Sequence, residues 1–450
     1  MARSNFGTKL GIVLATAGSA VGLGNVWRFP TMTGENGGAA FIFIYVACVF
    51  LLGIPGMLAE FVVGRRAHTN APRAYRKLGG KTLFAGVGYV GVFGGMIIFG
   101  FYSVIAGWCM HYLFASLMSD IHGTPDEIVA YFHGFSSSVW APLVWTAVFM
   151  LLTHIVVWGG VNKGIERCSK ILMPLLFVVL VIIVIASLCV PDAYKGVEFL
   201  FKPDFSKITP ETFLAALGQA FFTLSLGVAC LATYASYFGE NVNLAKSAMQ
   251  IAVVDTIVAI LAGLMIFPAA FSVGVQPDAG PSLIFITLPN VFQSAFSFFP
   301  GGGYIVSILF YALLVLAALT STISMHEIGT AFFTEELRLS RGKAASIVTV
   351  LCFGVAILSS LSFGVLSDVT LFDKPFLDFF DYITGQIIMP IGALLTCLLV
   401  GWYMPKTSVY EELTNRGTVA RKLFPVIFFA IRYICPICIT LIFLNLLGIV

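Results

Sequence analysis

Residues 18–25 have the sequence Gly18-Ser19-Ala20-Val21-Gly22-Leu23-Gly24-Asn25 and lie within the apolar stretch 10–32. That stretch is long enough to cross a bilayer, whose hydrocarbon core needs about 20 residues of helix. Glycine is a poor helix residue, and unpaired backbone at membrane depth is tolerated only where it lines a protected cavity. Three glycines and an asparagine so close together therefore predict a membrane helix that is broken beside a cavity.

A second interruption lies in the apolar stretch 212–237, where the run from Gln219 to Gly227 combines Gln, Thr, Ser and Gly. If the chain contains two halves of five spans, each half begins with its broken helix, and the second half enters the membrane inverted. Paired broken helices at corresponding places indicate a transporter whose site lies at the repeat interface. We expect a first half at 1–190, an extracellular linker at 191–211, a second half at 212–403, and a cytoplasmic loop with a last helix at 404–450.

The composition indicates a membrane protein along the whole chain. Of its 450 residues, 59% are apolar and 10% charged, whereas soluble chains are about 45–50% apolar and about 25% charged. The net charge of +3 gives no reason to expect a nucleic-acid partner. The sequence therefore predicts an all-α polytopic protein of the lipid bilayer with eleven transmembrane helices, near 10–32, 39–64, 84–118, 140–158, 171–190, 212–237, 248–273, 303–333, 345–363, 376–403 and 424–448.

The positive charges set the orientation of these spans. Lys and Arg number 19 in the N-terminal tail and in the loops on its side, at 65–81, 163–170, 238–247, 338–343 and 406–422. The opposite side has 4, namely Lys195, Lys202, Lys207 and Lys374. Loops rich in Lys and Arg stay in the cytoplasm. We therefore expect a cytoplasmic N-terminus and, after an odd number of spans, a C-terminus outside the cell.

Several motifs resemble those of the neurotransmitter:sodium symporter family, which includes a bacterial leucine transporter. They are Ala17 to Pro30, Glu35 to Gly38, Lys163 to Arg167, Gln219 to Gly227, Thr233 to Tyr237, Leu319 to Ser321 and Glu336 to Arg341. The resemblance runs across nearly the whole chain, although the family usually has a twelfth span. It implies the inverted five-helix repeat inferred above, and sodium-coupled symport by alternating access in the inner (plasma) membrane.

The resemblance also implies two sodium sites, built from oxygen ligands that suit a hard cation. The first would use the Ala20 carbonyl, the side chains of Asn25, Thr223 and Asp255, and a carboxylate of the substrate. The second would use the carbonyls of Gly18, Val21 and Ala317 with the hydroxyls of Thr320 and Ser321.

The same resemblance places a substrate between the broken helices. Its carboxylate would meet backbone N–H groups near Ala20, Gly22 and Gly24 and the hydroxyl of Tyr102. Its side chain would lie among Ile98, Phe222, Ser225, Val228, Ser321 and Met325. Family members that carry amines have Asp at the position of Gly22, so this chain is expected to take a substrate with its own carboxylate. We expect a neutral L-amino acid with a hydrophobic or aromatic side chain.

Two charge pairs resemble the gates of the family. Arg28 would pair with Asp378 on the outer side, with Phe222 and Tyr102 as the lid beneath. On the inner side, Arg3 is either a gate residue that pairs with Glu335, with Tyr237 nearby, or a positive-inside anchor. Gly164 and Pro174 would let the inner end of the fifth span unwind, because proline removes a helix hydrogen bond.

Chloride is expected to be dispensable. Animal members of the family hold chloride with residues that match Tyr45, Gln219 and Thr223. Chloride-independent members supply a carboxylate instead, at a position that is Ala259 here. Asp255 lies one helical turn earlier on the same face, so its charge can serve in place of chloride.

Other patterns carry less information. Cys435 and Cys438 have CxxC spacing without a second pair, which favours a packing role, and His326-Glu327 lacks the second histidine of a zinc protease because position 330 is Thr. With no nucleophile or phosphate-binding motif, we expect no enzyme. Glu60 is either a buried structural acid or a proton-linked group. A proton-coupled amino-acid transporter or an ion channel remains the alternative function, and the oligomeric state stays open.

Overall fold

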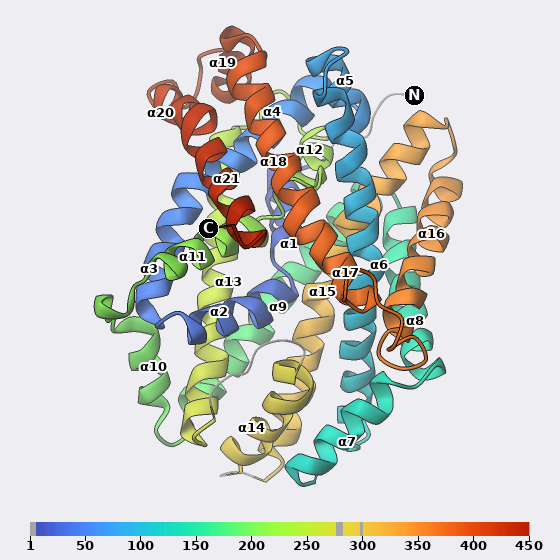
Figure 1. Ribbon diagram of the computed structural model, residues 1–450, viewed down its shortest axis with the longest axis vertical. Coiled ribbons are helices and arrows are strands. Elements are labelled where there is room, and N and C mark those ends of the chain that lie inside the picture. Colours follow the sequence, from blue (N-terminus) through green and yellow to red (C-terminus); the bar gives the residue numbers. More distant parts are fainter. Residues whose placement is uncertain (1–5, 122, 276–281, 298–299, 450) are drawn as a thin grey trace.

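The computed structural model describes residues 6–121, 123–275, 282–297 and 300–449, and this part of the chain is helical without a β-strand (Figure 1). The helices up to residue 201 are α1 (Lys9–Ala20), α2 (Phe29–Glu35), α3 (Ala39–Cys48), α4 (Ile54–Ala67), α5 (Ala71–Gly79), α6 (Phe84–Leu117), α7 (Pro125–Ser136), α8 (Trp140–Trp158), α9 (Arg167–Leu188) and α10 (Ala193–Phe201).

The later helices are α11 (Pro210–Thr223), α12 (Cys230–Ala235), α13 (Leu244–Ser272), α14 (Leu288–Ala295), α15 (Gly302–Glu336), α16 (Arg341–Leu361), α17 (Phe376–Asp381), α18 (Met389–Leu398), α19 (Lys406–Thr414), α20 (Phe424–Phe429) and α21 (Cys435–Leu446). π-Helical segments lie at Gly24–Arg28, Val49–Gly53, Val161–Glu166, Leu283–Thr287, Tyr382–Ile388, Leu399–Tyr403 and Ala430–Ile434, and a 3₁₀ turn lies at Phe205–Lys207.

Nine continuous helices of the described part are long and apolar enough to cross a membrane: Ala39–Ala67, Phe84–Leu117, Trp140–Trp158, Val161–Leu188, Leu244–Ser272, Gly302–Glu336, Arg341–Leu361, Phe376–Tyr403 and Phe424–Leu446. The bent pair Lys9–Ala20 and Gly24–Glu35 makes a tenth. The predicted span 212–237 is divided between α11 and α12, which are too short to meet that length individually. The polytopic all-α class is therefore confirmed, and the count of eleven stays a prediction.

The fifth span begins about ten residues earlier than its apolar pattern predicts, at Val161 rather than near 171. Its first turns carry charges that the hydropathy pattern assigns to a loop. Glu166 and Lys170 pair at 2.6 Å one turn apart, and such pairs stabilise a helix. Gly164 lies in this π-helical start and Pro174 lies inside α9, which is continuous past the proline.

The first break has the position that the glycines predict. α1 ends at Ala20, and the chain bends by 55° before it continues as Gly24–Glu35. The Asn25 side chain accepts a hydrogen bond from the freed N–H of Gly22 at 3.0 Å, and Tyr102 accepts one from the N–H of Leu23 at 2.9 Å. Side chains thus replace the helical partners that the break removes.

The second break separates α11 from α12 over residues 224–229. Ser225 and Ala229 have left-handed backbone, with φ of 52° and 58°, and Gly227 has φ of 90°. A Cβ atom on Gly227 would overlap the Met389 carbonyl in α18, so glycine is required there for space as well as for backbone angle.

Glu60, in α4, satisfies the backbone of this second break. Its carboxylate accepts the N–H of Gly227 at 2.6 Å and the N–H of Ala232 at 3.3 Å, and the residue is 1% exposed. A buried carboxylate is tolerated where it accepts such hydrogen bonds. The geometry therefore gives Glu60 a structural role, the first of the two that the sequence left open.

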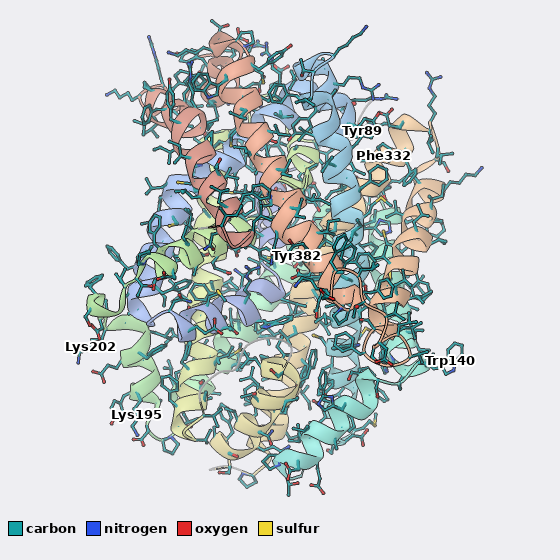
Figure 2. The ribbon with its side chains drawn as sticks, in the orientation of Figure 1. Tyr89, Trp140, Lys195, Lys202, Phe332 and Tyr382 are labelled. Atoms are coloured by element: carbon teal, nitrogen blue, oxygen red, sulfur yellow. The ribbon has the colours of Figure 1, made fainter. Side chains whose placement is uncertain are left out.

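The ion pairs at the two ends of the helical bundle differ in the segments that they join. Helices α5, α19 and α20 lie at one end, and α7, α10 and α14 at the other (Figure 1). The first end contains ion pairs that join segments far apart in sequence: Arg65–Glu412 at 2.7 Å, Arg66–Glu411 at 2.9 Å and Arg73–Glu336 at 2.7 Å. At the second end, Lys195 in α10 and Lys202 just after it point outward (Figure 2) and pair with nearby acids, Asp192 at 2.8 Å and Glu198 at 2.7 Å.

The CxxC cysteines of the last helix are unpaired. Cys435 is buried, and its Sγ lies 3.8 Å from the carbonyl oxygen of Leu52. Cys438, one turn further along α21, is a free thiol as well. These contacts agree with the packing role expected for them.

Replacement of Glu60 by Gln tests its structural role. The amide has one acceptor oxygen instead of two, so either Gly227 or Ala232 loses its partner, and we expect a loss of about 1–3 kcal/mol of stability. The measurement is the unfolding midpoint of purified Glu60→Gln in detergent. Glu240→Gln is the control. Glu240 is exposed, and its ion pair with Arg416 is long, at 3.6 Å, and exposed as well. Equal midpoints for the two variants would contradict the assignment.

Candidate functional site

A cavity of about 470 Å³ lies between the two helix breaks and helices α6, α15, α17 and α18. Its walls include all ten residues that the sequence predicts for substrate binding: Ala20, Gly22, Gly24, Ile98, Tyr102, Phe222, Ser225, Val228, Ser321 and Met325. These residues come from four separate segments of the chain. The tertiary structure therefore brings the predicted set together around one cavity.

The side chains predicted for the first sodium site meet beside this cavity. Asn25 donates from Nδ2 to Oδ1 of Asp255 at 2.8 Å, and Thr223 donates to Oδ2 of Asp255 at 3.0 Å. Tyr45 donates to the same carboxylate at 3.4 Å. Asn25, Thr223 and Asp255 are at most 4% exposed. The Asn25 amide oxygen accepts from the Gly22 N–H, so the carboxylate, the hydroxyl and this amide oxygen are the oxygens of the site that a hard cation could bind.

The residues predicted for the second sodium site also converge. The Thr320 hydroxyl lies 3.4 Å from the Val21 carbonyl and 2.9 Å from the Ala317 carbonyl. The Ser321 hydroxyl lies 3.1 Å from the Val21 carbonyl and 3.5 Å from that of Gly18. Five oxygens from the end of α1 and from the middle of α15 thus lie close together.

Gly22 lies against the two hydroxyls that face the break. A Cβ atom there would be 2.6 Å from Oγ of Ser321 and 2.9 Å from the hydroxyl of Tyr102. Any larger residue must therefore displace one of them. The structure adds this steric requirement to the electrostatic one inferred from the sequence.

Arg28 and Phe222 lie together in the wall of the cavity. The Arg28 guanidinium lies 4.2 Å from the centre of the Phe222 ring, a cation–π distance. The acid whose charge acts on Arg28 is Asp381, whereas Asp378 interacts with Lys374. Asp381 lies one turn along α17 from Asp378, and the predicted pairing of Arg28 with Asp378 stays a prediction. Both acids line the cavity, and sequence spacing alone could not tell which one faces Arg28.

On the inner side, Arg3 lies outside the described residues. Its predicted partner Glu335 accepts hydrogen bonds from the Thr69 hydroxyl and the Asn70 N–H, both at 2.8 Å. Tyr237 donates to Glu327 at 2.6 Å, and Arg341 donates to Glu327 at 2.5 Å. Glu327 is a buried acid, a role that its HExxH-like sequence context did not indicate.

The N-terminal segment packs against this inner side. The ring of Phe6 lies 5.9 Å from that of Tyr234 and 6.1 Å from that of Tyr237. Glu166 accepts the N–H of Gly7 and the hydroxyl of Thr8, both at 2.7 Å. These contacts connect the start of α1 to the start of the fifth span.

Further polar residues line the cavity and were missed, among them Ser19, Cys230 and Ser324. Ser19 and Ser324 are each three positions from a predicted site residue, Gly22 and Ser321, so helical spacing could have suggested them. Cys230 gave no such signal, because its place depends on where α12 begins.

Among the residues matched to a chloride site, Gln219 is 1% exposed, and its amide has no hydrogen-bond partner in the described part of the chain. Ala259 is fully buried in α13, one turn after Asp255.

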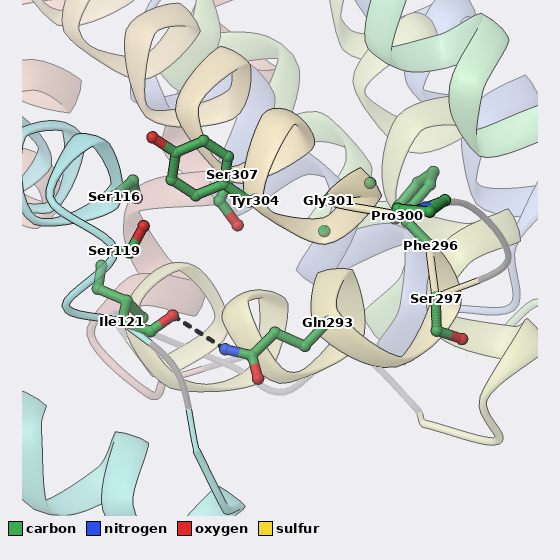
Figure 3. A pocket seen from close by; sticks show the side chains of 12 residues that line it. Ser116, Ser119, Ile121, Gln293, Phe296, Ser297, Pro300, Gly301, Tyr304 and Ser307 are labelled. Carbon is green, nitrogen blue, oxygen red and sulfur yellow. Dashed lines mark hydrogen bonds between the residues drawn. The ribbon is translucent and has the colours of Figure 1, made fainter.

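A second cavity, of about 530 Å³, lies apart from the first, beside the end of α6, α14 and the start of α15 (Figure 3). Its described lining is neutral, with serines, glycines and Gln293, whose amide donates to the Ile121 carbonyl at 3.0 Å. None of the predicted site residues belongs to it.

Comparison with known proteins gives one family. The model of the sodium:neurotransmitter symporter family matches residues 3–124 and 134–449. An uncharacterized sodium-dependent transporter of Bacillus subtilis, YhdH, is 42% identical over 98% of this chain and 97% of its own length. One from Haemophilus influenzae is 35% identical over 98% of both chains. The crystal structure of MhsT in complex with L-phenylalanine has a TM-score of 0.89 and 42% identity, and the match covers 99% of this chain and 100% of the other.

A double-mutant cycle tests which acid couples to Arg28. We expect the losses of unfolding free energy caused by Arg28→Ala and Asp381→Ala to differ from additivity by about 0.5–3 kcal/mol, the range for interacting neighbours. Arg28→Ala and Asp378→Ala, the matched control pair, should be closer to additive. The measurement is the free energy of unfolding in mixed micelles. A larger coupling for Asp378 than for Asp381 would restore the pairing predicted from the sequence.

Proposed function

This chain belongs to the sodium:neurotransmitter symporter family, and on that premise we propose that it is a sodium-coupled symporter of neutral L-amino acids with hydrophobic or aromatic side chains. The observation that carries the proposal is the convergence of two oxygen-rich groups of residues on one cavity between two broken helices. Broken helices that meet around a cavity are typical of transporters whose substrate and ions bind side by side.

Two sodium ions would be transported with the substrate. Asn25, Thr223 and Asp255, with the Ala20 carbonyl, would hold the first. The hydroxyls of Thr320 and Ser321, with the carbonyls of Gly18, Val21 and Ala317, would hold the second. In support, both sets are buried, the Thr223 hydroxyl lies within hydrogen-bond distance of the Asp255 carboxylate, and the Thr320 and Ser321 hydroxyls lie within that distance of backbone carbonyls of the second set.

An amino acid would bind with its carboxylate at the first break. The backbone N–H groups near Gly22 and Gly24 and the hydroxyl of Tyr102 are suited to an anion, because helix ends attract negative charge. No acidic side chain stands at position 22 to bind an amine without a carboxylate. MhsT, a structural neighbour, was solved with L-phenylalanine, which supports an aromatic or hydrophobic substrate here.

Alternating access would use contacts at both ends of the cavity. On the outer side, Arg28 with Asp381, above Phe222 and Tyr102, would close over the bound substrate. On the inner side, we propose that Arg3 pairs with Glu335 near Tyr237. The inner end of the fifth span, between Gly164 and Pro174, would unwind to let water reach the second sodium site.

We place the protein in the inner (plasma) membrane. The end of the bundle that contains α5 and α19 would face the cytoplasm, because its loops hold most of the Lys and Arg residues. The N-terminus would then be cytoplasmic and the C-terminus outside.

Uptake into proteoliposomes tests the proposal. Each of the twenty amino acids is offered with an inward sodium gradient, with a proton gradient, and with neither. We expect concentrative uptake of hydrophobic or aromatic amino acids with the sodium gradient only. Uptake driven by protons alone would favour the proton-coupled alternative, and passive sodium flux without amino-acid uptake would favour a channel.

Two ligand variants test the proposed sodium sites in the same assay. We expect Asn25→Ala and Thr320→Val each to raise the sodium concentration for half-maximal uptake about tenfold, which corresponds to about 1.4 kcal/mol. Thr33→Val is the matched control, because Thr33 is a buried threonine whose hydroxyl donates to the Phe29 carbonyl at 2.8 Å, away from the cavity. A sodium requirement that is the same in all three variants would rule out these sites.

Chloride replacement tests the role of Asp255. We propose that its carboxylate, one turn from Ala259, offsets part of the sodium charge. Sodium-driven uptake by the native protein should therefore be the same in gluconate as in chloride, whereas Asp255→Asn should lose most uptake when chloride is removed. Native uptake that fails without chloride would contradict the proposal, and so would an Asn variant that is indifferent to chloride.

A further inference from the structure

Three polar side chains form one end of the substrate cavity. Ser19 belongs to α1, Cys230 begins α12 and Ser324 belongs to α15, and all three line the cavity. Each is at most 2% exposed. The thiol of Cys230 lies close enough to both serines for electrostatic interaction, so the three side chains form one group, which we call the polar floor.

The polar floor lies about one helical turn from the place proposed for the amino-acid backbone. Gly22 faces Ser321 at that place, and Ser19 and Ser324 approach each other through Cys230. Ser19 precedes Gly22 by three positions and Ser324 follows Ser321 by three, so the two helix segments run antiparallel. With the rise of an α-helix, this spacing places the two serines of the polar floor about 4.5 Å along the helices from Gly22 and Ser321.

The hydroxyl protons of Ser19 and Ser324 already form hydrogen bonds within the protein. Ser19 donates to the Thr16 carbonyl at 2.7 Å, and Ser324 donates to the Ser321 carbonyl at 2.6 Å. Each hydroxyl keeps lone pairs that can accept a hydrogen bond, because a hydroxyl has one proton and two acceptor sites. The thiol of Cys230 adds one weak donor at most. The polar floor therefore offers acceptors to a ligand and few donors.

The walls above the polar floor are apolar. Ile98, Val228 and Met325 line the cavity from three different helices or breaks. A ring would be surrounded by these side chains, while a polar group at its far end would reach the two serines. A ring without such a group would leave the acceptors of the polar floor without a donor from the ligand.

We propose that the polar floor of Ser19, Cys230 and Ser324 accepts a hydrogen bond from a donor at the far end of an aromatic side chain, so that the transporter prefers L-tyrosine to L-phenylalanine. The proposal rests on the amino-acid symport proposed above and narrows its substrate class. The preference is moderate, because the serine protons are satisfied without the ligand and only the ligand's own donor changes partner.

Competition against sodium-driven uptake of labelled L-phenylalanine tests this preference in native protein. The competitors are L-tyrosine, O-methyl-L-tyrosine and unlabelled L-phenylalanine. L-Tyrosine should inhibit at about one tenth of the phenylalanine concentration, which is the effect of one hydrogen bond. O-Methyl-L-tyrosine keeps the oxygen but lacks its proton, so it should lose that advantage. Equal inhibition by tyrosine and phenylalanine, or by tyrosine and its methyl ether, would overturn the proposal.

Variants then locate the interaction. In Ser324→Ala and Ser19→Ala, the ratio of phenylalanine to tyrosine inhibitory concentrations should fall toward one. The ratio is used because it does not depend on the amount of folded protein. Ser359→Ala is the control, because Ser359 is a buried helical serine that donates to the Val355 carbonyl at 2.9 Å outside the cavity. It should keep the native ratio, and floor variants that also keep it would refute the role of the polar floor.

The two proposals fail in different ways. If no amino acid shows sodium-driven uptake, the proposed function is wrong and the substrate preference falls with it. If uptake of hydrophobic amino acids is intact and tyrosine has no advantage, only the role of the polar floor is wrong.

Discussion

Backbone N–H and C=O groups must find partners inside a membrane, because no water is available to bind them. Both helix breaks in this protein release such groups, and named side chains satisfy several of them. Asn25 accepts from Gly22, Tyr102 accepts from Leu23, and Glu60 accepts from Gly227 and Ala232. Several side chains that satisfy or face the breaks are also those proposed to bind ions or substrate. A bound carboxylate could therefore accept from the backbone N–H groups near the first break in place of these side chains.

The two buried carboxylates beside the breaks differ in the groups that hold them. Glu60 accepts from backbone N–H groups, which cannot move unless the broken helix moves as a whole. Asp255 accepts from the side chains of Asn25, Thr223 and Tyr45, which can rotate. This difference suits Glu60 to a fixed structural role and Asp255 to a site whose occupant changes.

The contacts at the inner end join the two elements that would have to move. Glu166 lies at the start of the fifth span and accepts from Gly7 and Thr8 at the start of α1. A Cβ on Gly11 would overlap the Glu166 side chain, so the two segments fit closely. Because these contacts are shared, unwinding near Gly164 would loosen the N-terminal segment as well.

The sequence by itself determined which helices break and which residue types surround the breaks. Glycines in an apolar span have a local effect on backbone, so the positions of both breaks and all ten cavity residues could be predicted from the motifs. The motifs did not predict which residues contact one another across different helices. The charge of Asp381 acts on Arg28, Glu327 joins Tyr237 to Arg341, and Cys230 lies beside Ser19 and Ser324. Only the tertiary structure decided these, because the rotation of one helix against another depends on packing over its whole length, which local spacing does not record.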